Sequence, residues 1–157
     1  MKTNSGKKGE GMPVVRNPQF NFKEGFCWNN ILNPNARLLK AKMKSASVND
    51  VGSMSLTTLI EEIPNYYFVS ILNSEVIFNY YREFINCTVN IQINDIRQVP
   101  VVIPSDKDLE KLQPLFKKAV ELKKTVAINF ATEENISNEI QKIESEINKI
   151  VEQLYGI

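Results

Sequence analysis

The chain has 157 residues, of which 43% are hydrophobic and 24% charged, so it can bury a core and does not have the composition of a disordered protein. Cys27 and Cys87 lie far apart and there is no histidine, which argues against a zinc site and excludes a Ser-His or Cys-His nucleophile. The first residues lack an apolar signal core, and no apolar run approaches the length of a membrane span. We therefore expect a cytoplasmic protein.

Positive charge is concentrated in the N-terminal third, although the net charge of the chain is only +1. Residues 1–50 contain nine Lys or Arg against three Asp or Glu, whereas the two later thirds are each net negative. This asymmetry suits a polyanionic partner. The alternative is a basic tail without a partner, because Lys2, Lys7 and Lys8 lie in the Gly- and Ser-containing start.

The first elements in chain order are a linker and short strands. The Gly-rich segment 1–12 predicts a flexible linker. Turn signals at Asn17-Pro18 and Asn33-Pro34 flank an apolar strand over Phe22–Trp28, and a second strand is expected over Arg37–Lys44.

A helix is predicted over 64–85, with a break at Asn73-Ser74. Apolar residues then alternate with amides from Thr88 to Asn94, which predicts a strand with one polar face. A further apolar strand, Val101–Ile103, is bracketed by two prolines.

The C-terminal third is expected to be helical. Ser105 can cap the first helix, and Pro114 predicts a kink or restart within it. The last helix has a heptad seam made of Ile136, Ile140, Ile143, Ile147, Ile150 and Leu154. We expect this seam to pack on the preceding helix as an antiparallel hairpin; an intermolecular coiled coil, or a seam that covers another part of a larger enzyme, is the alternative.

Together these elements predict an α+β fold. A small mixed sheet with packed helices would occupy residues 13–105, and the helical hairpin would occupy residues 106–157.

Five blocks of sequence, in order, resemble one family. They are FKEGFCWNNI (22–31), VNDVGSMSL (48–56), IPNYYFVSILNSEVIFNYY (63–81), FINCTVNIQINDIRQVPVVIP (84–104) and VEQLYGI (151–157). They resemble the C-terminal target-recognition domain of adenine-N6 DNA methyltransferases and type II restriction-modification enzymes, the TaqI-like specificity domains. The resemblance implies a module that reads double-stranded DNA and positions a target adenine for a catalytic domain elsewhere.

The residues themselves argue against catalysis by this chain. No Gly-rich strand-to-helix turn is available for S-adenosylmethionine, and Glu121-Leu122-Lys123 matches a nuclease motif only by letter within a helical stripe. We therefore expect no enzyme activity, no cofactor and no metal here, with S-adenosylmethionine bound only by the parent's methyltransferase domain or subunit.

For DNA phosphates the expected ligands are Arg37, Lys40, Lys42 and Lys44, because alternate lysines on a strand line one face. The alternative is an edge strand that its lysines protect against aggregation. For bases we expect Asn49, Asp50, Ser53 and Ser55, beside a Gly52 turn that permits close approach; a plain turn is the alternative there. Asn90 and Gln92 are weaker base candidates. The competing function is a protein-docking module that uses the heptad helix.

Overall fold

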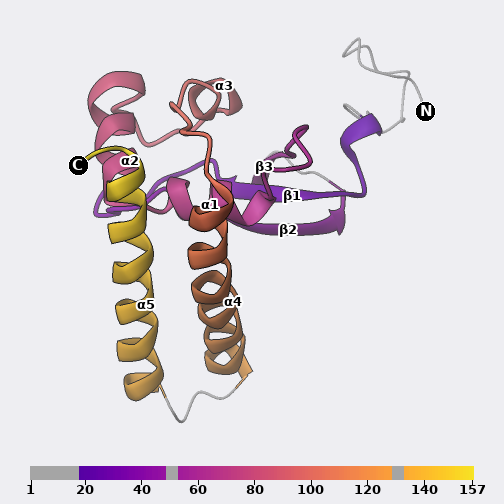
Figure 1. Ribbon diagram of the computed structural model, residues 1–157. Helices are drawn as coiled ribbons and strands as arrows, with labels where there is room; N and C mark the ends of the chain where they lie inside the picture. The colour runs from indigo at the N-terminus through magenta and orange to yellow at the C-terminus, as the bar shows by residue number, and fades with distance from the viewer. Residues whose placement is uncertain (1–17, 49–52, 129–132) are drawn as a thin grey trace, which may run out of the picture.

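The computed structural model describes residues 18–48, 53–128 and 133–157, in which a three-stranded sheet lies beside a group of helices (Figure 1). The strand order is β2 (Lys42–Ser47), β1 (Lys23–Asn29), β3 (Ser53–Leu56), and both pairings are antiparallel. The α+β class is confirmed. The sheet is antiparallel throughout, so the expected mixed sheet is wrong in this respect; the expected linker, residues 1–12, lies outside the described residues.

β1 is the central strand, and its sequence explains why. Phe26, Cys27 and Trp28 are all buried, in keeping with the position of β1 between two neighbouring strands. Gly25 permits close pairing, because a Cβ atom there would lie 2.2 Å from the Leu56 carbonyl oxygen. The prediction of a strand at Phe22–Trp28 is confirmed with a shift of one residue.

The second strand begins later than predicted. β2 starts at Lys42 and not at Arg37, because Lys40 has a left-handed backbone with φ of 54° and interrupts the extended chain. A short 3-10 turn, η1 (Pro18–Phe20), precedes β1, in agreement with the turn signal there.

The predicted helical region is divided as expected. It consists of α1 (Asn65–Leu72), α2 (Glu75–Tyr80) and a π-helical turn, η2 (Tyr81–Ile85). Ser74 separates α1 from α2, since its hydroxyl accepts a hydrogen bond from the Ile77 backbone N–H at 3.3 Å and caps α2.

The prediction of a strand over Thr88–Asn94 is wrong. Only an isolated bridge between Ile31 and Asn90 forms, and the chain then turns into the short helix α3 (Ile93–Ile96). The Asp95 carboxylate accepts hydrogen bonds from the Gln92 backbone N–H and the Asn86 side chain, both at 2.8 Å. The first of these bonds satisfies the Gln92 N–H without a neighbouring strand, and the second fixes the Asp95 carboxylate.

The Pro-bounded segment Val101–Ile103 is not a strand either. Residues 100–104 form neither a helix nor a strand, and two tyrosine hydroxyls donate to carbonyl groups in and next to the segment. Tyr67 donates to Val102 O at 2.6 Å, and Tyr155 donates to Pro100 O at 2.7 Å. Burial raises the pKa of both phenols, and for Tyr67 the neighbouring Tyr155 and Asp108 add to the effect.

The C-terminal helical hairpin is confirmed. α4 (Asp106–Ile128) and α5 (Glu133–Leu154) lie side by side and extend away from the sheet (Figure 1). Pro114 is accommodated within α4. Ile143 is 5% exposed, while the other members of the predicted seam are half-buried.

One core joins the sheet to the helices. Trp28 of β1, Tyr67 of α1, Leu112 of α4 and Val151 of α5 are fully buried in it. The hairpin therefore packs on the rest of the fold through its end nearest the sheet. None of the described helices has both the length and the apolar character needed to cross a membrane.

Candidate nucleic-acid interface

The sheet has one face toward the helices and one face away from them. Phe26 stacks on Phe68 of α1, with ring centroids 5.2 Å apart and planes inclined by 9°. Trp28 points to the same side, where its Nε1 donates to Ile91 O at 3.4 Å. Because successive strand residues alternate, Gly25 and Cys27 belong to the opposite face.

The strand register gathers several expected DNA ligands on that opposite face. Cys27 is paired with Lys42 on β2 and with Ser55 on β3, and Gly25 is paired with Lys44. Directly opposed residues in antiparallel strands project to the same side of a sheet. A row from Lys42 across Cys27 to Ser55 therefore spans about 10 Å, the width of two strand spacings.

Lys44 is engaged by its own backbone surroundings. Its ammonium group donates to the carbonyl oxygens of Lys23 at 2.9 Å, Ser45 at 3.2 Å and Ser47 at 2.9 Å. These three acceptors use all three donors of the group. These hydrogen bonds lie at the register shift in β1 between Lys23 and Gly25 and stabilise the chain there. We therefore leave Lys44 out of the DNA contacts proposed below.

Lys40 and Arg37 precede β2 and are exposed. Lys40 lies outside the strand, so the expectation that Lys40, Lys42 and Lys44 line one strand face is wrong. The chain between Lys40 and Lys42 is held by Asn73, whose side chain bonds the backbone of Ala41. Both basic residues nevertheless lie close in sequence to Lys42 and Lys44 of β2.

The expected base-reading segment is only partly described. Asn49 and Asp50 lie outside the described residues. Ser53 begins β3 and is paired in register with Asn29, and Ser55 is part of the row described above. The segment thus leads from the end of β2 to the opposite edge of the same sheet.

The weaker candidates, Asn90 and Gln92, do not belong to the sheet. Asn90 is exposed and its backbone forms the bridge to Ile31, while Gln92 precedes α3. The residue that organises this region is Asp95, which also accepts from the Tyr81 hydroxyl at 3.3 Å. Burial, followed by this carboxylate, raises the pKa of Tyr81. We assign the region a structural role.

Charge in this part of the chain is strongly positive. Within residues 18–48 the basic side chains are Lys23, Arg37, Lys40, Lys42 and Lys44, and Glu24 is the sole acidic one. A shallow hollow of about 340 Å³ adjoins β2, lined in part by Cys27, Lys42 and Val48. The exposed cations of this surface can attract phosphates.

Two features that the sequence did not suggest lie at the start of β1. Lys23 Nζ lies 5.8 Å from the centre of the Phe20 ring, and Phe22 is 70% exposed with φ of 58°. An aromatic residue next to a lysine carries no specific sequence signal. Its exposure and its backbone conformation appear only in the fold.

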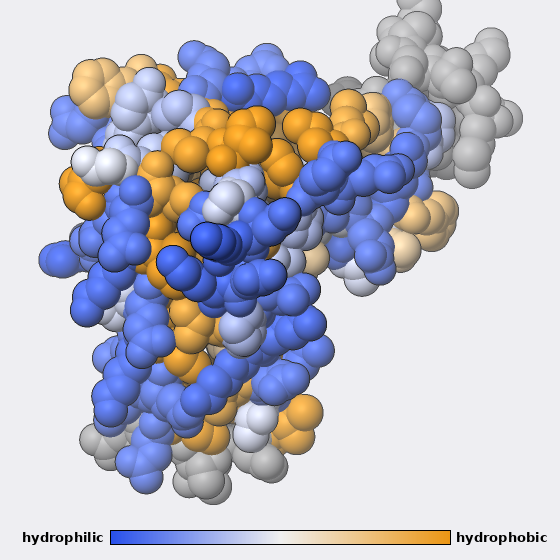
Figure 2. All heavy atoms as spheres, viewed as in Figure 1, coloured by the Kyte–Doolittle hydropathy of each residue, from blue (hydrophilic) through white to orange (hydrophobic). Residues whose placement is uncertain are grey.

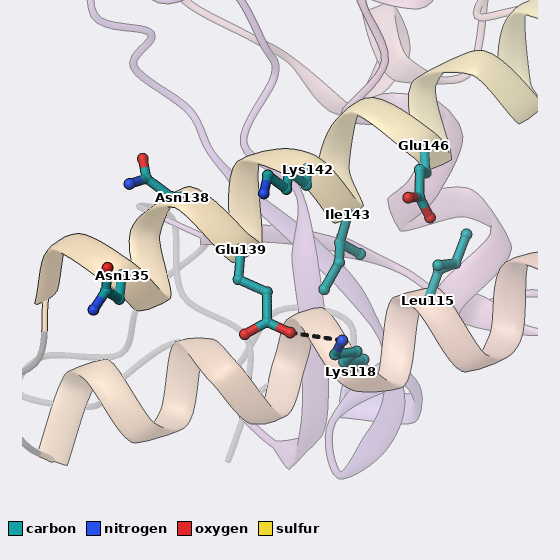
Figure 3. A pocket seen from close by; sticks show the side chains of 8 residues that line it. All are labelled: Leu115, Lys118, Asn135, Asn138, Glu139, Lys142, Ile143 and Glu146. Carbon is teal, nitrogen blue, oxygen red and sulfur yellow. Dashed lines mark ion pairs between the residues drawn. The ribbon is translucent and has the colours of Figure 1, made fainter.

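Two other surfaces are less suited to a polyanion. In Figure 2 apolar side chains gather over the segment that joins α3 to α4, where Val101 and Ile103 are exposed. A groove of about 540 Å³ lies between α4 and α5 (Figure 3), where Ile143 and Leu115 point toward one another. Lys118 and Glu139 form an ion pair across this groove at 2.6 Å.

Within residues 18–48, 53–128 and 133–157, no three His, Cys, Asp or Glu side chains converge in a way that could hold a metal ion. Neither the models of known protein families nor the curated protein sequences match this chain.

Proposed function

We propose that this chain recognises double-stranded DNA by sequence, as the specificity module of an adenine-N6 methyltransferase or restriction-modification enzyme. The proposal assigns catalysis, S-adenosylmethionine and the flipped adenine to the parent's methyltransferase domain or subunit. The chain itself would supply affinity and choice of sequence.

The observation that carries the proposal is the row from Lys42 across Cys27 to Ser55 on the face of the sheet turned away from α1. It brings a cation and a hydroxyl, which are far apart in sequence, to one surface. The surrounding excess of lysine and arginine would draw the phosphate backbone toward this face.

Phosphate and base contacts would come from different parts of this surface. Arg37, Lys40 and Lys42 are exposed cations that would position the duplex without reading it. Asn49, Asp50, Ser53 and Ser55 are of the types that hydrogen-bond to base edges, and they belong to the segment that crosses from β2 to β3. The first group would set affinity and the second specificity.

The competing proposal is a module that docks a protein through α5. The half-buried residues Ile140 and Ile147 support it, because a two-helix hairpin leaves part of its seam uncovered. Against it, Ile143 and Val151 of the same helix are already buried within the chain. The ion pairs Lys118–Glu139 and Lys123–Glu144 also join α5 to α4.

A selection experiment tests the proposal. The chain would be incubated with a randomised duplex pool, and the bound fraction sequenced after several rounds. A DNA reader should enrich one motif and bind it at least about 10³-fold more tightly than scrambled duplex. Ser55→Ala should weaken binding to the enriched motif alone. An unenriched pool would contradict sequence reading.

A further inference from the structure

Phe22 is, with Lys40, one of two described non-glycine residues that have a positive φ. Its φ of 58° is left-handed, a conformation that a bulky side chain rarely adopts because its Cβ atom approaches the backbone. The ring is also 70% exposed, so burial of the ring does not compensate for the strain. Residues held in this way tend to occur at functional sites.

The neighbouring backbone holds Phe22 in this conformation. Its N–H donates to Ser47 O at 3.0 Å, which ties it to the end of β2. The next carbonyl, Lys23 O, accepts from the Lys44 ammonium at 2.9 Å, and Asn21 N–H donates to Pro18 O at 3.1 Å. The bonds from β2, from Lys44 and within the turn at Pro18–Asn21 together hold the backbone so that the Phe22 ring is exposed to solvent.

The charge around the ring fits a nucleic acid. Lys23 follows Phe22 directly and is exposed, and the Lys44 ammonium lies 2.9 Å from the carbonyl oxygen of Lys23. The nearest acidic residue in sequence is Glu24. An apolar ring flanked by cations matches the chemistry of base steps, whose flat faces lie between phosphates.

We infer that Phe22 is an aromatic wedge that stacks on a base step of the bound duplex, beside the end of β2 to which its backbone is hydrogen-bonded. The inference rests on the proposed function and deepens it. The added contact would respond to how easily a base step unstacks, whereas the contacts proposed above recognise base edges. Lys23 would neutralise a phosphate beside the wedge. Lys44 acts as a positioning residue, because it holds the backbone next to Phe22.

The test uses two substitutions of Phe22: one relieves the backbone strain and removes the stacking ring, and the other keeps both. Phe22→Gly removes the ring and accepts a positive φ, so it should raise the melting temperature while weakening duplex binding about tenfold. Phe22→Trp keeps a stacking ring and should bind as the wild type does. Phe84→Ala is the matched control, since Phe84 is 75% exposed but lies on η2.

A second readout separates stacking from general affinity. A central mismatch lowers the cost of unstacking, so the wild type should prefer a mismatched to a matched mixed-sequence duplex, and Phe22→Gly should lose this preference. If Phe22→Gly binds both duplexes as the wild type does, the wedge is wrong although DNA binding stands. A lower melting temperature for Phe22→Gly would make the ring a packing residue and also overturn the inference. If the wild type binds neither duplex, the proposed function falls together with the wedge.

Discussion

The side-chain amide of Asn73 makes two hydrogen bonds with the backbone of Ala41, one from its Nδ2 to Ala41 O and one from Ala41 N to its Oδ1, each 2.8 Å long. Asn73 thereby takes the place of a neighbouring strand at the residue just before β2. It ties the end of α1 to the point where the basic strand begins.

Asn73→Ala should therefore destabilise the fold. It leaves the N–H and carbonyl of Ala41, a residue only 7% exposed, without partners, which should cost about 2 kcal/mol. Urea unfolding measures the loss. Asn79→Ala, at an exposed position on α2, is the control and should change stability by less than about 0.5 kcal/mol. An equal change in unfolding free energy for the two variants would contradict a stabilising role for the Asn73 hydrogen bonds.

The hairpin should be stabilised within one chain. Ile143→Ala removes buried methyl groups from the seam and should cost about 2 to 5 kcal/mol, whereas Ile128→Ala, at a position 77% exposed, should cost less than about 0.5 kcal/mol. The melting temperature of the wild type should not depend on protein concentration. A melting temperature that rises with concentration would indicate pairing of α5 between chains.

The start of α4 should be sensitive to acid. Asp108 accepts from the Ser105 hydroxyl at 2.6 Å and from the Ser105 backbone N–H at 2.9 Å, and these bonds, the hydroxyl first, lower the pKa of the Asp108 carboxyl. Because the folded pKa is depressed, this stabilisation is present above the unfolded pKa of about 3.9 and is lost as the pH falls through the folded value.

Asp108→Ala should consequently cost about 1 kcal/mol at neutral pH, and the difference from the wild type should shrink below about pH 4. Unfolding curves at several pH values measure it. A difference that does not change with pH would mean that the carboxylate charge has no part in the cap.

Alkaline conditions should weaken the contact between α1 and the 100–104 segment. Burial raises the pKa of Tyr67, so its stabilisation is complete below the unfolded pKa of about 10 and is lost as the pH rises toward the folded value. Tyr67→Phe loses the bond to Val102 O, at a cost of about 1 kcal/mol near pH 7. The variant should nevertheless lose less stability than the wild type between pH 9 and 11. Parallel losses in the two proteins would contradict this role for the phenol.

Sequence patterns predicted the elements whose signals are local. The heptad spacing of α5, the helix break at Asn73-Ser74, the capping residue Ser105 and the apolar run of β1 each appear in the structure as expected. In these cases the residues that decide the conformation lie within a few positions of one another, or form one continuous face.

Predictions that required knowledge of tertiary partners were wrong or incomplete. Alternation over Thr88–Asn94 resembles a strand, but among the described residues it finds no partner beyond the single bridge at Asn90, and Asp95 turns the chain into α3. The alternate lysines looked equivalent, yet Lys40 precedes the strand and the Lys44 ammonium is used by three carbonyl groups. No local pattern indicates the left-handed backbone of Phe22.

The salt dependence of duplex binding tests the central claim most directly. If Lys40 and Lys42 contact phosphates, the double variant Lys40→Ala/Lys42→Ala should reduce the slope of log affinity against log salt by about 1.8 and weaken binding to all duplexes alike. Lys117→Ala/Lys124→Ala removes the same charge from exposed positions on α4 and should leave the slope unchanged. Equal slopes for the wild type and both variants would contradict a DNA contact at the sheet face.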